Sequence, residues 1–154
     1  MKLEGPERYR ITIRPAGSFE IEDSSGDTKF HGNATSRLPK LYVVSAAGTP
    51  IYVGGTRQTM RKRLRLGWTA KGESGYHGYK WRHDHKEVGL DVWYQVEPPS
   101  LNTSQDIETV EAEVVFLIRQ HGQWPASQTE IHFHESTREL RAIAAMVWSQ
   151  YEKT

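Results

Sequence analysis

The sequence predicts a single α+β domain in which a small antiparallel β-sheet is flanked by helices. The chain has 154 residues, the usual size of one domain with one core. Short segments of alternating polar and apolar residues fill its first third, and two long segments with apolar residues three and four apart fill its last third. We therefore expect one domain over residues 1–154, with an N-terminal β-hairpin and a C-terminal helix.

The first two strands form a hairpin at the N-terminus. Residues 9–13 and 19–22 alternate polar and apolar side chains, and the break between them contains Pro15 and Gly17. This pattern is typical of two antiparallel strands joined by a turn. Residues 23–39 are polar and contain several turn residues, which predicts a loop that completes an N-terminal segment over 1–39.

A second hairpin and a third strand form the centre of the predicted sheet. Residues 40–45 and 51–54 are rich in Tyr, Val and Ile and flank a turn that contains glycine and proline. Residues 91–96 have the same character, and the Pro-Pro pair at 98–99 ends that strand.

Helical periodicity occurs in three places. Residues 59–66 follow it, with a threonine as the N-cap and Gly67 as the predicted end. Residues 104–121 carry an apolar stripe, and 136–151 begin with a capping-box-like run and carry a wide apolar face that packs on the core or on a second subunit. Residues 68–87 show little periodicity, which predicts a long functional loop.

Positive charge is concentrated in one part of the chain. The whole sequence carries a net charge of +1, but residues 57–86 hold nine basic residues against two acidic ones, which leaves a net charge of −6 for the remainder. This block also carries Trp68, Tyr76, Tyr79 and Trp81. Such a combination is expected of a surface that binds nucleic acid or another polyanion, and a solvated helix face followed by a loop is the alternative.

The composition excludes several classes of protein. The chain has no cysteine, which excludes a disulfide framework, a thiolate zinc site and a cysteine nucleophile. No apolar run is long enough to cross a bilayer, and the first residues do not resemble a signal peptide. We therefore expect a soluble cytoplasmic protein with no membrane partner.

Residues 40–128 resemble a known enzyme family. They contain Lys40-Leu41-Tyr42, then Tyr52-Val53-Gly54 ten residues later, and Arg63 on the helix that follows. In this order the motifs resemble the GIY-YIG nuclease family, although the first motif lacks its Gly and the second has Val in place of Ile. The resemblance implies that 40–128 is a nuclease core that hydrolyses DNA phosphodiester bonds with a metal ion, in the manner of a small type II restriction enzyme, and that 129–154 is a C-terminal extension.

The resemblance implies that Tyr42, Tyr52 and Arg63 are catalytic. Neighbouring strands can bring both tyrosine hydroxyls to one sheet face, and Arg63 can offer its guanidinium to a phosphate. We expect Tyr42 to be the general base that activates water. A free tyrosine titrates only near about pH 10, so Tyr42 needs assistance, and we assign His77 as its proton relay.

The metal ligand implied by the resemblance falls on the helix over 104–121. Glu111 and Glu113 both lie beside its apolar stripe, and the family pattern favours Glu113, with Glu111 as the alternative. One carboxylate with waters and a phosphate oxygen is a usual way to hold Mg²⁺, for which Mn²⁺ is a substitute. Gln128 stands where the family often has Asn.

The expected partner is DNA, bound by a homodimer so that both strands are cut. The residues expected to contact nucleic acid are Arg57, Arg61, Lys62, Arg65, Tyr79, Lys80, Arg82 and Gln128. Three alternatives stay open: a nucleic-acid-binding module without catalysis, a repair or RNA-directed nuclease of the same fold, and a protein whose basic block binds an acidic protein.

Two histidine pairs form a competing pattern. His83 and His85, like His132 and His134, lie two residues apart, and the two pairs could bind zinc if the fold brought them together. Nothing in the sequence brings these segments together, so we do not expect a zinc site.

Overall fold

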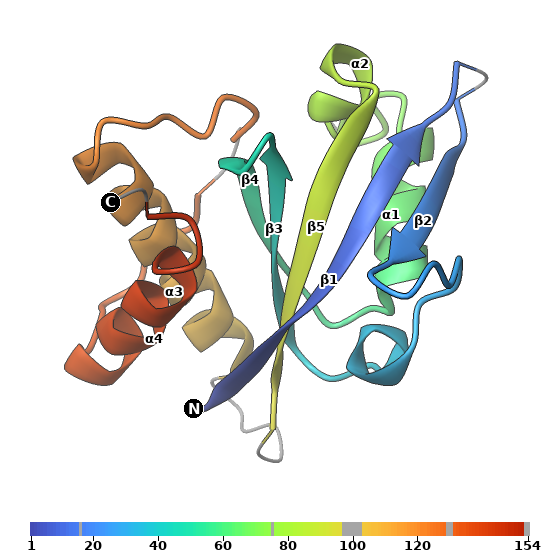
Figure 1. The fold of residues 1–154 in the computed structure, drawn as a ribbon. Helices are drawn as coiled ribbons and strands as arrows, with labels where there is room; N and C mark the ends of the chain where they lie inside the picture. The colour runs from blue at the N-terminus through green and yellow to red at the C-terminus, as the bar shows by residue number, and fades with distance from the viewer. Residues whose placement is uncertain (16, 75, 97–102, 129–130, 153–154) are drawn as a thin grey trace.

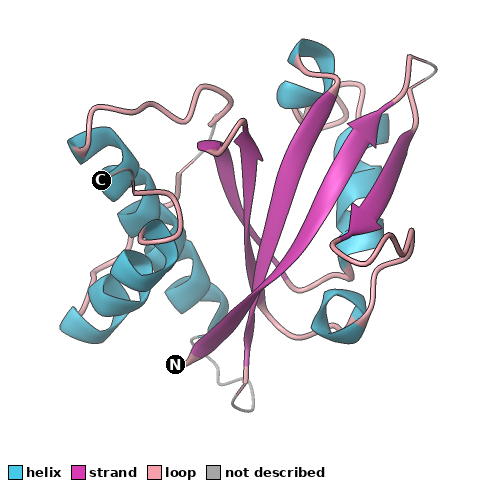
Figure 2. Cartoon of the chain, viewed as in Figure 1, coloured by secondary structure: helices cyan, strands magenta, loops and turns pink. Residues whose placement is uncertain are grey.

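A computed structural model describes the chain except for residues 16, 75, 97–102, 129–130 and 153–154. It is an α+β structure in which a five-stranded antiparallel sheet has helices on both sides (Figures 1 and 2). The predicted fold class is confirmed, including the N-terminal strand hairpin and the C-terminal helix. Within the described ranges, none of the helices has both the length and the apolar character needed to cross a membrane.

The sheet has the strand order β2-β1-β5-β3-β4, so β2 and β4 are its edges. Its strands are β1 (Leu3–Ile13), β2 (Phe19–Asp23), β3 (Lys40–Ala46), β4 (Thr49–Thr56) and β5 (Glu87–Gln95). β1 and β5 start earlier than predicted, because they pair with each other from Leu3 opposite Gln95 to Thr12 opposite Glu87. The Pro-Pro pair expected to end β5 lies outside the described residues.

The helices cover the two faces of the sheet separately. They are α1 (Met60–Thr69), α2 (Trp81–Asp84), α3 (Thr103–Gln120) and α4 (Arg138–Trp148), with a short 3₁₀ helix, η1 (Gly32–Thr35). Figure 1 shows α3 and α4 on one side of the sheet and α1 and α2 on the other. The segment predicted as a long loop between α1 and β5 therefore contains one short helix.

The alternation of side chains along β3 divides the core into two clusters. Tyr42 and Val44 point to the α1 side, where they join Leu64, Trp68 and Trp81. Leu41 and Val43, which alternate with them, point to the α3 side. That second cluster includes Leu41, Val43, Val53, Trp93, Ile107, Val110, Val114, Ala144 and Val147. The C-terminal helix packs on α3 and thus belongs to the core of the same chain.

Caps define where α1 and α4 begin. The Thr59 hydroxyl accepts the Lys62 backbone N–H at 3.3 Å, and the Thr137 hydroxyl accepts that of Leu140 at 3.2 Å. The predicted end of α1 at Gly67 is wrong, because the helix continues to Thr69.

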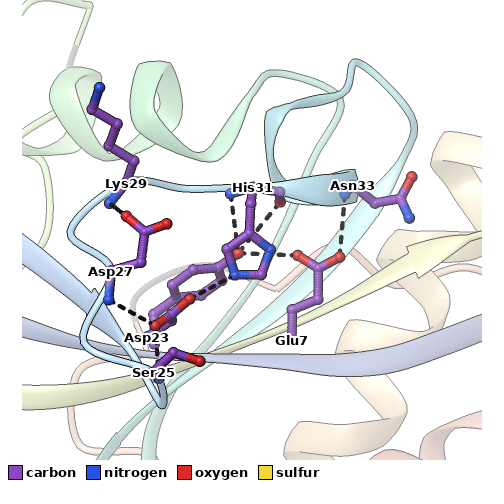
Figure 3. Close-up of polar contacts among 8 residues, drawn as sticks. Glu7, Asp23, Ser25, Asp27, Lys29, His31 and Asn33 are labelled. Atoms are coloured by element: carbon purple, nitrogen blue, oxygen red, sulfur yellow. Dashed lines mark hydrogen bonds and ion pairs between the residues drawn. The ribbon is translucent and has the colours of Figure 1, made fainter.

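The polar segment 23–39, predicted as a loop, contains η1 and is tied to the sheet by a network of polar contacts (Figure 3). Asp23 accepts the backbone N–H of Asp27 at 3.0 Å, and its other carboxylate oxygen lies 3.0 Å from His31 Nε2. Glu7 on β1 accepts the backbone N–H of Asn33 at 3.2 Å. These contacts hold the segment against β1 as the chain runs on to β3.

Candidate active site

A cavity of about 310 Å³ opens between β4, α1 and α3. Tyr52 lines it from β4, Arg63 from α1, Glu108 and Glu111 from α3, and His132 from the segment before α4. The structure therefore brings together two of the predicted catalytic residues with one of the two candidate acids.

Of the two candidate metal ligands, the structure places Glu111 at this cavity and not the preferred Glu113. The cavity is lined from α3 by Ser104, Ile107, Glu108 and Glu111, which are spaced three and four apart and share one face of the helix. Two further residues along a helix turn the side chain by about 200°, so Glu113 points elsewhere. Glu111 is 9% exposed, whereas Glu113 is half-buried and away from the cavity.

In the structure Gln128, predicted to contact nucleic acid, bonds to the edge strand β4 and lies near Glu111. Its side-chain oxygen accepts the Val53 backbone N–H at 2.8 Å, and its amide nitrogen donates to the Val53 carbonyl at 3.1 Å. The same nitrogen lies 3.5 Å from Glu111 Oε1. Gln128 thus takes the place of a neighbouring strand for β4 and links that strand to the acid of the cavity.

The two predicted tyrosines lie one behind the other. Tyr52 lines the cavity, whereas Tyr42 is fully buried, with its ring centroid 5.9 Å from that of Tyr52. Tyr42 lies opposite Gly54 in the sheet, and a Cβ atom at Gly54 would come within 2.7 Å of the Tyr42 hydroxyl oxygen. Only glycine leaves room for this hydroxyl, which lies behind the cavity wall.

Burial governs the protonation of both tyrosines. It raises the pKa of Tyr42 and of Tyr52 well above the ordinary tyrosine value, and the nearby Arg63 guanidinium lowers each pKa in part. Both hydroxyls are therefore neutral at physiological pH. Tyr52 is the tyrosine that a molecule in the cavity would meet, which corrects the expectation that Tyr42 contacts the water directly.

Arg63 is held in place by aromatic side chains. Its Nη1 donates to the Tyr76 hydroxyl at 2.9 Å. Its guanidinium carbon lies 5.5 Å from the Tyr76 ring centroid and 5.0 Å from that of Tyr79. Both distances are typical of cation–π contacts, so the guanidinium keeps its charge while its direction is restricted. The sequence showed Tyr76 only as one of several aromatic residues in a loop.

Tyr79 is buried, and its predicted contact with nucleic acid is wrong. It is 2% exposed, and its hydroxyl oxygen lies 2.9 Å from that of Tyr42. The predicted proton relay, His77, lies elsewhere: its ring is exposed and lies against Gly72. The structure thus places Tyr79, and not His77, next to Tyr42.

Arg82, predicted to contact nucleic acid, makes several hydrogen bonds within the protein. Its Nη1 donates to the carbonyl oxygens of Gly67 and Tyr79, each at 2.9 Å, and to that of His77 at 3.2 Å. The guanidinium therefore joins the end of α1 to the segment before α2.

The other predicted contacts remain at the surface. Arg57 is exposed at the rim of the cavity, and Arg61 lies over the Phe30 ring with its guanidinium carbon 5.6 Å from the centroid. Lys62, Arg65 and Lys80 are exposed as well.

A second cavity of about 840 Å³ lies at the C-terminal end of α1. Its lining includes Lys71, Lys86, His83 and His85, with Trp68 among them. Because basic and imidazole groups outnumber acids around it, this basic groove favours an anionic occupant.

The two histidine pairs do not meet. His83 and His85 line the basic groove, whereas His132 lines the first cavity and His134 contacts Glu108. Over the part of the chain that the structure describes, no group of three or more His, Asp or Glu side chains could hold a metal ion. Glu111 offers a single carboxylate, which fits a hard cation completed by water and substrate oxygens and not a zinc site.

Comparisons with family models, with curated proteins and with solved structures give no match for this chain. Its function is therefore inferred from the motifs of the sequence and the geometry of the two cavities.

Proposed function

We propose that this protein is a divalent-metal-dependent endonuclease that hydrolyses DNA phosphodiester bonds at the cavity of Tyr52, Arg63 and Glu111. The observation that carries the proposal is the convergence of these side chains from β4, α1 and α3 on one cavity of about 310 Å³. Their types and order along the chain resemble the GIY-YIG nucleases. A hydroxyl, a guanidinium and a carboxylate are the groups that phosphodiester hydrolysis needs.

Each side chain has a distinct role in this proposal. Arg63, restrained by Tyr76 and Tyr79, binds the phosphate that is cut and stabilises its developing charge. The Tyr52 hydroxyl at the cavity wall orients the attacking water, with Tyr42 behind it. Glu111 would hold Mg²⁺, or Mn²⁺ in its place, and such an ion supplies charge stabilisation for the leaving oxygen.

The basic surface supports DNA as the substrate. Arg57 lines the cavity and the exposed Lys62 precedes Arg63 on α1, and the basic groove with Lys71 and Lys86 continues this charge at the far end of α1. A helix rises 1.5 Å per residue, so Arg63 and the groove are separated by about 10 Å along α1, a few nucleotides of a strand. Neighbouring phosphates of one DNA can therefore contact both.

We further propose a small type II restriction enzyme that acts as a homodimer. In this proposal one chain supplies one cavity, with Arg63 for the phosphate and Glu111 for the metal, and cuts one strand. Two copies related by a twofold axis would cut both strands of a palindromic site.

The test is the conversion of supercoiled plasmid to nicked and linear DNA with Mg²⁺, Mn²⁺ or EDTA. We expect cleavage that requires the metal and that falls by about 100-fold or more in Arg63→Ala. Arg65→Ala is the matched control, since Arg65 is exposed on the same helix but points about 200° away from Arg63 and does not line the cavity, and it should stay within a few-fold of the wild type. Salt-sensitive DNA binding with no cleavage under any metal condition would overturn the catalytic proposal in favour of a binding module.

A further inference from the structure

Tyr79 contacts Tyr42, Tyr52 and Arg63, which come from three different elements. We infer that Tyr79 is a positioning residue that fixes these side chains for cleavage, an inference that rests on the proposed nuclease function. Nothing in its local sequence indicates such a role, because Tyr79 belongs to an irregular segment between α1 and α2.

The contact with Tyr42 is a hydrogen bond between two buried hydroxyls, whose oxygens are 2.9 Å apart. The Tyr79 hydroxyl also lies 3.5 Å from the Arg63 backbone carbonyl, to which it can only donate. When Tyr79 donates there, its oxygen accepts the Tyr42 O–H. The Tyr42 proton then points away from the cavity, and an oxygen lone pair is left on the side of Tyr52.

The contacts with Tyr52 and Arg63 are made by the Tyr79 ring. Its centroid lies 5.5 Å from that of Tyr52, with the ring planes at 76°, the edge-to-face arrangement that aromatic pairs favour. The Arg63 guanidinium carbon lies 5.0 Å from the same centroid. Since Tyr52 and Arg63 both line the cavity, one ring supports the water-orienting and the phosphate-binding groups together.

The surrounding chain is built to hold Tyr79 at this place. A Cβ atom at Gly67 would come within 2.1 Å of the Tyr79 ring, so only glycine in this turn of α1 admits it. The Tyr79 backbone N–H donates to the Gly67 carbonyl at 3.1 Å. The Trp81 ring stacks on that of Tyr79, with centroids 4.8 Å apart, and Arg82 donates hydrogen bonds to the carbonyls of both Gly67 and Tyr79.

Titratable and charged groups face Tyr42 and Tyr52 from several elements. Arg63 acts on both, Tyr79 acts on Tyr42, and Glu111 on α3 acts on Tyr52. Loss of the Tyr79 hydroxyl therefore changes the protonation behaviour of the site in addition to its packing.

The experiment compares Tyr79→Phe with Tyr151→Phe. Tyr151 is the matched control, because its hydroxyl is also buried and donates to Asp91 Oδ2 at 2.6 Å on the α3 side of the sheet, away from the cavity. Plasmid cleavage is measured against pH, and kcat and KM are separated on a short duplex. For Tyr79→Phe we expect kcat to fall about tenfold or more, KM to stay within about twofold, and the pH profile to change.

Tyr151→Phe should keep the kcat and pH profile of the wild type even if its Tm falls. If Tyr79→Phe likewise loses only Tm and keeps the wild-type kcat and pH profile, Tyr79 is a core residue and the inference is overturned.

A second readout separates this inference from the nuclease proposal. If the wild type cleaves no DNA, the nuclease proposal fails, and the exchange of tyrosine hydroxyl protons with solvent is then measured by NMR. Slow exchange of the Tyr42 hydroxyl in the wild type and in Tyr151→Phe, lost in Tyr79→Phe, would support the positioning of Tyr42 by Tyr79. Equal exchange in all three proteins would contradict it.

Discussion

The side-chain amide of Gln128 pairs with both backbone groups of Val53, accepting its N–H at 2.8 Å and donating to its carbonyl at 3.1 Å. β4 is an edge strand, so this amide satisfies groups that would otherwise face away from any neighbouring strand. Its nitrogen also lies 3.5 Å from Glu111 Oε1. The edge of the sheet and the acid of the cavity are thus held by one side chain.

Gln128→Ala should lower stability and activity together. Loss of the paired hydrogen bonds to Val53 should reduce the free energy of unfolding by about 1–2 kcal/mol, measured by urea denaturation. Metal-dependent cleavage should fall about tenfold, because Glu111 loses its restraint. Gln123→Ala is the control, since Gln123 lies in the same segment and its buried side-chain oxygen has no hydrogen-bond partner in the described structure. An equal effect of both substitutions would argue against a specific role for Gln128.

Gly67→Ala should destabilise the protein, although alanine favours helix. In an open helix this change would add up to about 1 kcal/mol of stability. Here the new Cβ would lie 2.1 Å from the Tyr79 ring, so the free energy of unfolding should fall by about 1–3 kcal/mol. Urea titration measures whether the free energy of unfolding falls or rises in Gly67→Ala. A more stable variant would contradict the close approach of Tyr79.

Stability should rise with pH between about 8 and 10 because of Lys40. Burial lowers the pKa of Lys40 from 10.5 to about 8, with an opposing effect of Glu7, while its Nζ donates to the Ser36 and Leu38 carbonyls at 2.7 and 2.6 Å. The unfolded chain keeps the ordinary lysine pKa and binds more protons over this range. The free energy of unfolding therefore increases with pH, by up to about 2 kcal/mol.

Above about pH 10 the trend should reverse. Burial raises the pKa of Tyr42, Tyr52 and Tyr79, so these tyrosines ionise first in the unfolded chain, which then binds fewer protons. Lys40→Met should remove the rise and keep the fall in urea titrations across pH. An unchanged rise in this variant would assign the effect to another group.

Exposed lysines on α1 should contribute to DNA affinity through charge alone. Lys62→Glu should weaken binding of a random duplex, measured by fluorescence anisotropy in EDTA, and reduce the slope of log K against log salt by about 0.9 for the lost phosphate contact. Arg141→Glu removes an exposed charge from α4 on the other side of the sheet and should leave the slope unchanged. Equal slopes for both variants would place the DNA elsewhere.

The sequence predicted the sheet and those site residues that lie close together along the chain. Tyr42, Tyr52 and Arg63 lie within one hairpin and the helix that follows, so their spacing restricts their arrangement. Glu111 and Glu113 could not be separated, because both border the apolar stripe of α3. The rotation of that helix depends on how it packs against β4, a contact between segments distant in sequence.

Tyr79 and Gln128 could not be assigned from the sequence for a related reason. Both lie in irregular segments, and both reach residues far away in the chain: Tyr79 reaches Tyr42, and Gln128 reaches Val53. From the sequence alone, an aromatic or amide side chain in a loop can be interpreted as a ligand contact. Only the fold shows which distant residue of the same chain it contacts. For Tyr79 the sequence offers one indication, Gly67, since a glycine inside a helix indicates a close neighbour.

The most direct test of the central claim compares Glu111→Gln with Glu113→Gln in plasmid cleavage with Mg²⁺ and Mn²⁺. The substitutions are identical in chemistry and two residues apart on α3, but only Glu111 lines the cavity with Tyr52 and Arg63. We predict that Glu111→Gln loses cleavage by about 100-fold or more while it keeps DNA binding, and that Glu113→Gln cleaves like the wild type. Full activity in Glu111→Gln would contradict the proposed site.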